Sequence, residues 1–274
     1  MRIVILAPGV YSETACAMAA HLAAMGYVPV GAIALTSFDG KTLLRKIGQW
    51  GPREVASFAR SKLFARPGRS SACLGNPHLR RFLGHHSVIF RSLREVASRY
   101  DFPVAIFRDQ NGPDTISTLH EWLPDLIVFT GGSILRQQVL EVPRLGVLNV
   151  HLGLLPEVRG MSSPEWSLLK NIPVGITIHY MDQGIDTGPV LQRFELSGMN
   201  RYRSLKDLRD RLIAFGVEKV ADVVGALDSG AISATPQSDL GKDNQFFAMH
   251  ECLQARSAER LTRNRHVVEE TMHG

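Results

Sequence analysis

Strand and helix patterns alternate through the first half of the chain, and this alternation limits the fold more than any other feature of the sequence. An apolar run at residues 3–7 predicts a buried strand, and the segment from Glu13, with Ser12 as its N-cap, has helical apolar spacing. Strands that alternate with helices form a parallel sheet covered on both faces. We therefore expect an α/β fold with a doubly wound, mostly parallel sheet. Further strands are expected at 28–35, 104–107, 125–130, 146–150, 174–181 and 188–195, and further helices at 92–99, 136–140, 164–170 and 205–227.

Composition and charge suggest how the chain is divided. The 274 residues, 45% of them hydrophobic, are enough for one large core. Residues 41–81 contain ten Lys and Arg but only one acidic residue, Glu54, which predicts a basic helical insertion at about 39–86, after the second strand. We assign residues 1–230 to the main domain. Residues 231–274 are predicted to be a short C-terminal extension, partly helical or disordered, because the sequence turns polar there.

Other sequence features bear on compartment and metals. No run approaches the roughly eighteen apolar residues that span a bilayer, and the apolar N-terminal run is short for a signal peptide, so we expect a cytoplasmic protein without membrane contact. The three cysteines, Cys16, Cys73 and Cys252, are far apart and lack metal-ligand spacing. We therefore expect neither disulfides nor a metal site.

Three polar side chains of different chemistry, Asn149, His151 and Asp186, lie where strand-like runs meet Gly- or Pro-containing loops. An amide can donate to the oxyanion of a tetrahedral intermediate, an imidazole can move protons near neutral pH, and a carboxylate can orient that imidazole. In an extended segment, Asn149 and His151 lie on the same side, roughly 6 to 7 Å apart along the strand. Each residue alone is more often a loop or turn residue, but the combination favours catalysis of acyl transfer.

Four short patterns recur in order around these residues: 146–151, Leu154-Leu155-Pro156, Arg159-Gly160 and the run 175–189. They resemble the folate-dependent formyltransferases, which include methionyl-tRNA formyltransferase, glycinamide ribonucleotide transformylase and the sugar N-formyltransferases. The match is strong over about residues 124–191. The resemblance implies that residues 1–230 are a formyltransferase catalytic domain, that Asn149, His151 and Asp186 are its catalytic residues, and that 10-formyltetrahydrofolate is the formyl donor.

The resemblance also implies where the donor binds, and the sequence itself offers candidate contacts for the acceptor. Glycines in the turn after the strand at 125–130 would let the backbone approach a flat pterin ring. The expected folate-binding residues are Thr130, Gly131, Gly132, Ser133, Ile134, Leu135, Gln183 and Ile185. A helix N-terminus offers free amides to a phosphate, so acceptor contacts are expected from Gly9, Val10, Tyr11 and Ser12. Gly153 and Arg159 are further candidates, although family members often have Ser at the position of Gly153.

The identity of the acceptor remains open at the level of sequence. We favour a small, anionic amine, either a nucleotide-linked amino sugar or a hydroxylated amino acid, because fewer than about fifty residues follow the long helix, too few for a typical five-stranded barrel. The alternative is a methionyl-tRNA formyltransferase without the usual C-terminal domain, and the basic insertion favours it. A third hypothesis, a folate-binding protein without turnover, is opposed by the three catalytic residue types.

The remaining predictions concern the other histidines and self-association. His179 lies inside a strand-like run, so a structural role is favoured over a catalytic one. His78, His85 and His86 lie in a polar, basic region and are expected to be solvated. The polar tail after Ala234 is a candidate subunit contact in a homo-oligomer.

Overall fold

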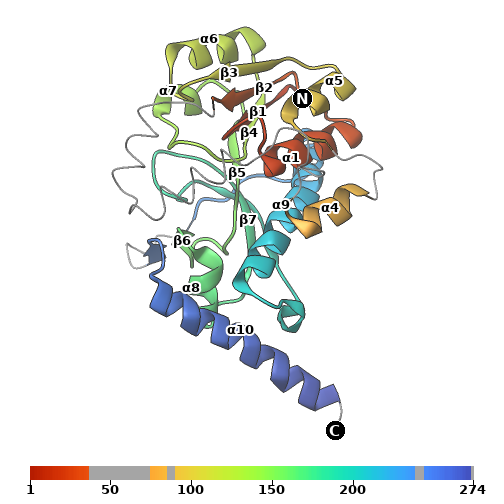
Figure 1. Ribbon diagram of the computed structural model, residues 1–274. Coiled ribbons are helices and arrows are strands. Elements are labelled where there is room, and N and C mark those ends of the chain that lie inside the picture. Colours follow the sequence, from red (N-terminus) through yellow and green to blue (C-terminus); the bar gives the residue numbers. More distant parts are fainter. Residues whose placement is uncertain (37–74, 85–89, 238–243, 273–274) are drawn as a thin grey trace, which may run out of the picture.

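A seven-stranded sheet forms the centre of the molecule in the computed structural model (Figure 1), which describes residues 1–36, 75–84, 90–237 and 244–272. The strands stand in the order β3-β2-β1-β4-β5-β7-β8. Strands β1 to β5 are parallel, whereas β7 runs antiparallel to β5 and β8 antiparallel to β7. The mostly parallel α/β sheet predicted from the sequence is thereby confirmed. The strands are β1 (Ile3–Ala7), β2 (Gly31–Leu35), β3 (Val104–Phe107), β4 (Leu126–Phe129), β5 (Gly146–His151), β7 (Gly175–Tyr180) and β8 (Val190–Glu195).

Helices cover both faces of this sheet. Alternate residues of β1 enter two different hydrophobic clusters: Ile3 and Ile5 belong to one, and Val4 and Leu6 to the other. The first cluster lies under α1 (Glu13–Ala24), α4 (Pro77–Gly84), α5 (Leu93–Tyr100) and α9 (Leu205–Asp228). The second lies under α6 (Pro113–Trp122) and α7 (Gln137–Leu140). Most of the predicted basic insertion lies outside the described residues.

Capping side chains explain where two of the helices begin. Ser12 Oγ accepts a hydrogen bond from Ala15 N at the start of α1, as the sequence predicted. Ser204 Oγ accepts from Asp207 N at the start of α9. Asp207 Oδ2 in turn accepts from the N–H of Arg203, which is one residue before Ser204, the expected donor in a capping box.

Strand β2 and helix α6 differ from the prediction. Strand β2 begins at Gly31 and not at residue 28, and Pro29, which has no N–H to donate to a ladder, precedes it. Helix α6 was not predicted, although Pro113 follows Gly112 directly and Pro is common in the first turn of a helix. Its apolar face is short, because only Thr115 and Leu119 are buried.

A second, smaller layer lies at the lower end of the molecule in Figure 1. It contains α8 (Ser163–Lys170), the 3₁₀ turn η1 (Met199–Arg201), α10 (Glu251–Met272) and a two-stranded parallel sheet of β6 (Arg159–Gly160) and β9 (Gln245–Phe246). Helix α10 packs on α8 and η1, with Ser257 and Leu261 buried. Part of the predicted surface tail is therefore packed against the core. Within the described ranges, no helix is long and apolar enough to cross a membrane.

Candidate functional site

The pairing of β5 with β7 brings the first two predicted catalytic residues together with a histidine. Asn149 lies opposite His179, and His151, the last residue of β5, lies opposite Thr177. Directly opposed residues of an antiparallel pair project from the same face, so all four side chains share one face. The loop between β7 and β8 places Asp186 beside this face, within reach of both histidines.

His151 is held from both ring nitrogens. Its Nε2 lies 2.8 Å from the carbonyl O of Val158, which can only accept, and 3.2 Å from Ser163 Oγ. Its Nδ1 lies 3.2 Å from Asp186 Oδ2. The ring is 7% exposed. Because acceptors face both nitrogens, the surroundings are arranged to stabilise the imidazolium once a proton arrives.

Asp186 is part-buried, with its side chain 16% exposed, among groups that stabilise its carboxylate. Oδ2 accepts from the N–H of Gly160 at 2.9 Å, and Oδ1 lies 3.6 Å from His179 Nε2. The backbone of Asp186 is left-handed, with φ of 54°, a conformation that costs a non-glycine residue free energy. The turn must therefore be stabilised from outside.

Burial and neighbouring charges shift the pKa values of His151 and Asp186 in opposite directions. Burial is the largest influence on His151 and lowers the pKa of its imidazole below 6.5, against the charge of Asp186 and the Val158 carbonyl, which raise it. Burial would raise the pKa of Asp186, but the neighbouring His179 ring, the charge of His151 and the Gly160 N–H together hold that pKa below 3.8. At neutral pH the site therefore contains a carboxylate beside a neutral imidazole.

The sequence favoured a structural role for His179, but its ring contacts Asn149, one of the predicted catalytic residues. Its Nδ1 lies 2.8 Å from the Tyr180 carbonyl, so Nδ1 carries a hydrogen, and Nε2 lies 3.2 Å from Asn149 Nδ2. The ring is 1% exposed. His179 thus fixes the amide plane of Asn149. His179 is brought to Asn149 by the register between β5 and β7. That register could not be read from the sequence, so no local pattern pointed to this contact.

Gly153 packs against His151. A Cβ on Gly153 would lie 2.9 Å from His151 Nε2, 2.9 Å from Ser163 Cβ and 3.0 Å from the Val158 carbonyl. The position that often holds Ser in the resembling family therefore has no room for a side chain here unless His151 or its neighbours move.

The predicted folate-binding turn follows β4 and is built around a buried glutamine that the sequence analysis missed. Gln110 Nε2 donates to the carbonyl of Gly131, and Gln110 Oε1 accepts from the N–H of Ser133. Gly131 and Gly132 have φ of 122° and 139°. A Cβ on Gly132 would lie 2.1 Å from Gln110 Oε1, so the turn requires glycine there.

The other predicted folate residues differ in exposure. Leu135 is buried in the cluster that also contacts Met181, which connects this turn with the Asp186 loop. Ile134 is 79% exposed and Ile185 47% exposed, and Gln183 is also exposed. Thr130 is tied to Leu6, because both its N–H and its hydroxyl donate to that carbonyl. Ser133, Ile134, Gln183 and Ile185 therefore remain accessible, whereas Leu135 does not.

The predicted acceptor residues lie in two places. Gly9, Val10, Tyr11 and Ser12 form the turn from β1 into α1, where Tyr11 is 72% exposed but Val10 is buried and Ser12 Oγ caps the helix. Arg159 lies in β6, next to Gly160. A cavity of about 200 Å³ connects the first turn of α1 with the ends of β4 and β5. It is lined mainly by apolar residues of α1, β4, β5 and α9: Thr14, Met18, Phe129, Thr130, Val150, Leu152, Ile213, Gly216 and Val217.

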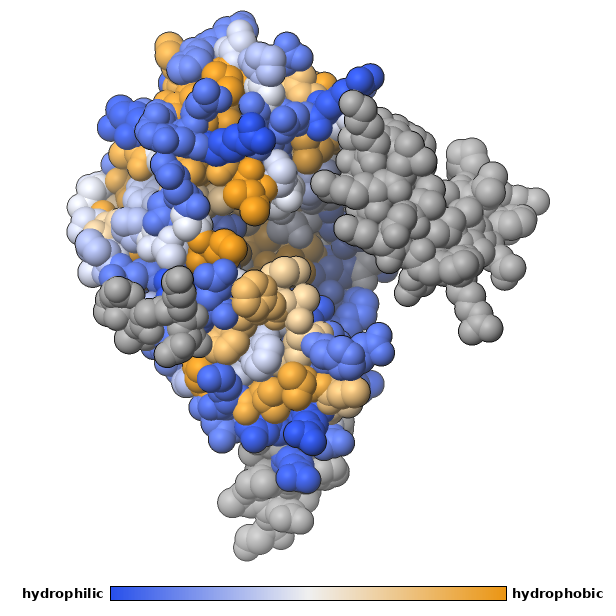
Figure 2. Space-filling view, turned by 90° about the vertical axis from the view of Figure 1, so that its left-hand side faces the viewer, coloured by the Kyte–Doolittle hydropathy of each residue, from blue (hydrophilic) through white to orange (hydrophobic). Residues whose placement is uncertain are grey.

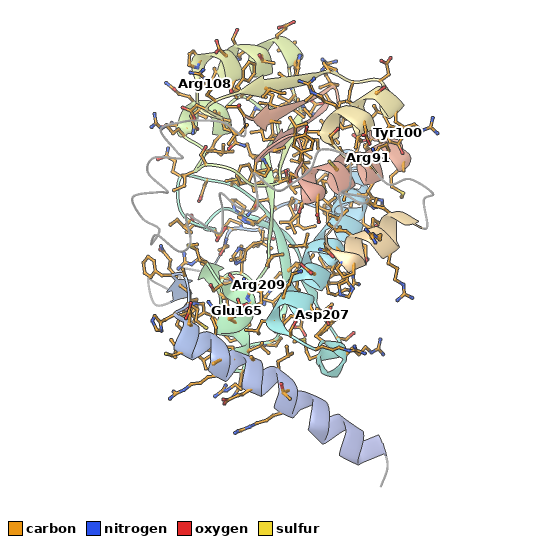
Figure 3. All side chains as sticks on the ribbon, viewed as in Figure 1. Arg91, Tyr100, Arg108, Glu165, Asp207 and Arg209 are labelled. Carbon is orange, nitrogen blue, oxygen red and sulfur yellow. The ribbon has the colours of Figure 1, made fainter. Side chains whose placement is uncertain are left out.

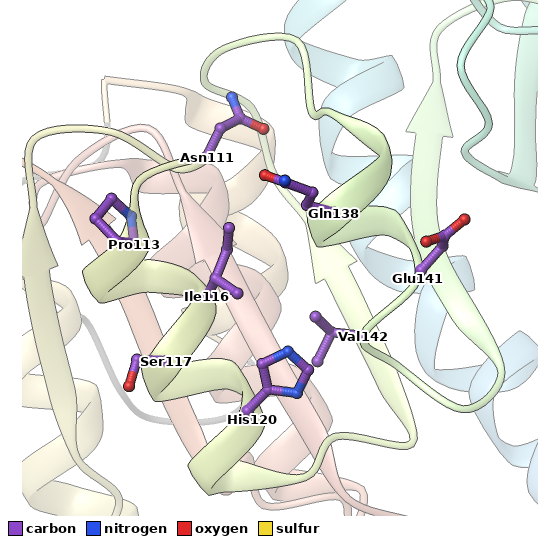
Figure 4. Close-up of a pocket in the computed structure, with 8 residues that line it drawn as sticks. All are labelled: Asn111, Pro113, Ile116, Ser117, His120, Gln138, Glu141 and Val142. Carbon is purple, nitrogen blue, oxygen red and sulfur yellow. The ribbon is translucent and has the colours of Figure 1, made fainter.

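A larger open cavity, of about 640 Å³, lies between α6 and α7 (Figure 4). Its lining includes Asn111, Ser117, His120 and Glu141, and none of the predicted site residues. On the face shown in Figure 2, apolar side chains gather around a hollow. Exposed large apolar residues of the molecule include Ile134, Ile185, Met161 and Phe247.

The histidines outside the site have separate surroundings. His78 was expected to be solvated, but its Nε2 lies 2.8 Å from Asp207 Oδ1 and its side chain is 27% exposed, so it is paired with a carboxylate. His85 and His86 lie outside the described residues. Over the part of the chain that the structure describes, no three His, Cys, Asp or Glu side chains are grouped to hold a metal ion.

Comparison with known proteins gives formyltransferases. A formyl transferase family model matches residues 94–224, which include Asn149, His151 and Asp186. Methionyl-tRNA formyltransferase of Pelobacter propionicus is 30% identical over 197 residues, covering 71% of this chain and 61% of the relative. The enzyme of the same name from Geobacter metallireducens is 33% identical over 54% of this chain and 48% of its own. The chain thus spans about half the length of the curated relatives it matches.

Solved structures agree in fold. Phosphoribosylglycinamide formyltransferase from Bacillus halodurans superposes with a TM-score of 0.54 at 18% identity, covering 88% of this chain and 98% of that one. A sugar N-formyltransferase from a Shewanella species gives 0.55 at 13% identity, covering 95% and 87%. With the strand order, the three converging side chains and the matched residues in agreement, the chain belongs to the folate-dependent formyltransferase family.

Proposed function

We propose that this chain transfers a formyl group from 10-formyltetrahydrofolate to a primary amine. The observation that carries the proposal is the convergence of three side chains inside the family-matched region. His151 Nδ1 is 3.2 Å from Asp186 Oδ2, and Asn149 is held beside them through His179. An amide donor, a buried imidazole and a carboxylate are the groups that acyl transfer between nitrogens requires.

Each of the three residues has a distinct role in this reaction. The amine nitrogen attacks the formyl carbon, the bond from that carbon to the donor nitrogen breaks, the amine loses a proton and the leaving nitrogen gains one. One Nδ2 hydrogen of Asn149 is directed to His179, and the other serves the negative charge that develops on the formyl oxygen. His151 accepts the proton because burial keeps it neutral. Asp186 orients the ring and stabilises the imidazolium.

The turn after β4 and the loop before Asp186 fit a folate donor. The positive φ values of Gly131 and Gly132 turn backbone groups outward without a Cβ in the way. The exposed side chains of Ile134 and Ile185 offer apolar contact to a flat ring. We assign Thr130 to Leu135, with Gln183 and Ile185, to donor binding on these grounds.

For the acceptor, we propose methionyl-tRNA in preference to the small anionic amine that the sequence favoured. The curated relatives bear the name methionyl-tRNA formyltransferase. A 200 Å³ cavity near the end of β5 is lined by Met18, Phe129, Ile213 and Val217, which suits an apolar side chain, although its lining contains none of the three predicted catalytic residues. A sugar ring, whose hydroxyls need hydrogen-bond partners, fits such a lining less well.

Transfer of an isotopic label tests this function. The protein is incubated with donor labelled in its formyl carbon and with methionyl-tRNA or a nucleotide-linked amino sugar, and each acceptor is analysed by mass spectrometry. Label should appear on the methionyl amine, at a rate that falls steeply as salt increases, because many phosphate contacts are involved. Labelled amino sugar at a salt-independent rate would instead support the small-metabolite hypothesis.

Variants separate catalysis from binding in the same assay. His151→Ala and Asp186→Asn should abolish most of the label transfer, whereas His120→Ala, a substitution of a histidine on α6, should not. If the wild-type protein binds the donor but transfers label to neither acceptor, the result would support the hypothesis of a folate-binding protein without turnover.

A further inference from the structure

The left-handed turn at Asp186 is held by a residue far along the chain. Gln237 Nε2 donates to the carbonyl of Asp186 at 2.9 Å and to the carbonyl of Gly188 at 2.7 Å. The two hydrogens of one amide therefore connect both sides of the turn. Gln237 is part-buried and 51 residues away from Asp186 in sequence.

The backbone before Gln237 is fixed to the edge of the sheet. Thr235 pairs with Val190, the first residue of β8, through two backbone hydrogen bonds of 2.8 Å. This bridge places Gln237 two residues further along the extended segment, beside the turn that precedes β8. The position of the Gln237 side chain is therefore set by the pairing of Thr235 with β8.

The carboxylate end of Asp186 is supported from the opposite side by β9. Asp186 Oδ2 accepts from Gly160 N, and Gly160 lies opposite Phe246 in the β6–β9 pair. The next N–H, that of Met161, donates to the Phe246 carbonyl at 2.9 Å. Gly160 has φ of 89°, and a Cβ there would lie 2.2 Å from the Phe246 carbonyl O, so the two backbones are in close contact.

From these contacts, we propose that Gln237 is a positioning residue for the catalytic pair: its amide holds the Asp186 backbone so that the carboxylate reaches His151. Strand β9 holds Gly160, the other partner of the carboxylate. The region after α9, predicted as an extension, thus supplies contacts on which the site depends. This inference rests on the proposed function for its kinetic consequence, but its structural consequence can be measured without turnover.

Gln237→Met tests the proposal, because methionine keeps the length of the side chain and cannot donate to either carbonyl. Without the two Gln237 hydrogen bonds, Asp186 no longer stays beside His151. The imidazole then loses an interaction that favours its protonated form. Titration of the histidine ring signals by NMR should therefore give a lower pKa for His151 in the variant. The His151 signal is identified by its absence in His151→Gln.

Kinetics give the second readout on the same variant. Misplacement of a catalytic group by about 1 Å costs on the order of 10²-fold in rate, so kcat should fall by about that factor. KM for the donor should stay within about threefold, because Gln237 contacts no predicted folate residue. The matched control is Gln254→Met: Gln254 also donates to a backbone carbonyl, that of Met249, but contacts neither Asp186 nor Gly188.

An unchanged His151 pKa together with an unchanged kcat in Gln237→Met would overturn the proposal, as would equal effects in Gln254→Met. If Gln237→Met fails to fold, Gln237→Asn carries the same test, because its shorter neutral amide falls short of both carbonyls. If the wild-type protein transfers no formyl group, the NMR titration still decides whether Gln237 positions Asp186. Failure of the proposed function and failure of this inference are therefore distinguishable.

Discussion

At the scale of single residues, the catalytic proposal depends on two titrating groups. Burial lowers the pKa of His151 below its usual value of 6.5, so the ring is neutral and able to accept a proton at neutral pH. We expect kcat to remain constant down to below pH 6.5 and to fall only as His151 becomes protonated. Asp186→Asn removes a charge that raises this pKa, so the acid limb of the residual activity should move to lower pH. A pH profile of kcat checks both, and an acid limb above pH 6.5 in the wild type would contradict the assignment.

Gly153 gives a second prediction at this scale. Gly153→Ala places a methyl group within 3.0 Å of His151 Nε2, Ser163 Cβ and the Val158 carbonyl, so the ring must shift. A loss in kcat of about 10²-fold is expected from such a displacement. Gly84→Ala, at the end of α4 where a Cβ would meet nothing within 4 Å, is the control. Equal kcat in both variants would show that His151 tolerates the change.

Asn149, His151 and Asp186 could be predicted because strand alternation and the resembling motif both lie within a short stretch of sequence. The contacts of His179 depend on the register between β5 and β7, which pairs residues thirty positions apart. Gln110 and Gln237 act through side-chain bonds to loops far away in sequence, and neither has a local pattern. Such long-range partners are visible only in the folded chain.

At the scale of secondary-structure elements, the turn after β4 yields a prediction for donor binding. Gln110→Met removes the bonds to the Gly131 carbonyl and the Ser133 N–H. Each bond contributes about 1 kcal/mol, so we expect the KM for the donor to rise by about tenfold or more. The acid limb of kcat should stay in place. Gln138→Met, on the exposed face of α7, should leave KM unchanged.

Most elements of the main sheet were predictable because their apolar runs are long and regular. Helix α6 was missed because its buried face has only two residues, and β6 and β9 because each is two residues long. Strand β9 exists through its pairing with β6, some eighty residues earlier, and not through its own sequence. One of these missed elements, β6, contains Gly160, which donates to the Asp186 carboxylate.

At the scale of the whole molecule, an ion pair between a buried carboxylate and a part-exposed guanidinium connects the smaller layer to helix α9. Glu165 of α8 is fully buried, and its Oε1 lies 2.6 Å from Arg209 Nε of α9. Figure 3 labels both residues. Helix α8 begins with Ser163, which contacts His151. Arg209 therefore supports both the fold and the setting of the site.

Arg209→Ala should destabilise the protein strongly, because it leaves the Glu165 carboxylate buried without its partner. We expect the free energy of unfolding, measured by urea denaturation, to fall by about 3 kcal/mol. Lys206→Ala breaks an exposed ion pair with Asp210 and should cost at most about 0.5 kcal/mol. Similar losses in the two variants would mean that the Glu165–Arg209 pair contributes no more to the free energy of unfolding than the exposed Lys206–Asp210 pair.

The most direct test of the central claim is the rate of tetrahydrofolate release with saturating donor and methionyl-tRNA, compared among wild type, His151→Ala, Asp186→Asn and the double variant. Residues that act as one unit have non-additive effects, so the double variant should be about as slow as His151→Ala alone, with both far below wild type. Equal release by wild type and both single variants would contradict the assignment of His151 and Asp186 as the catalytic pair.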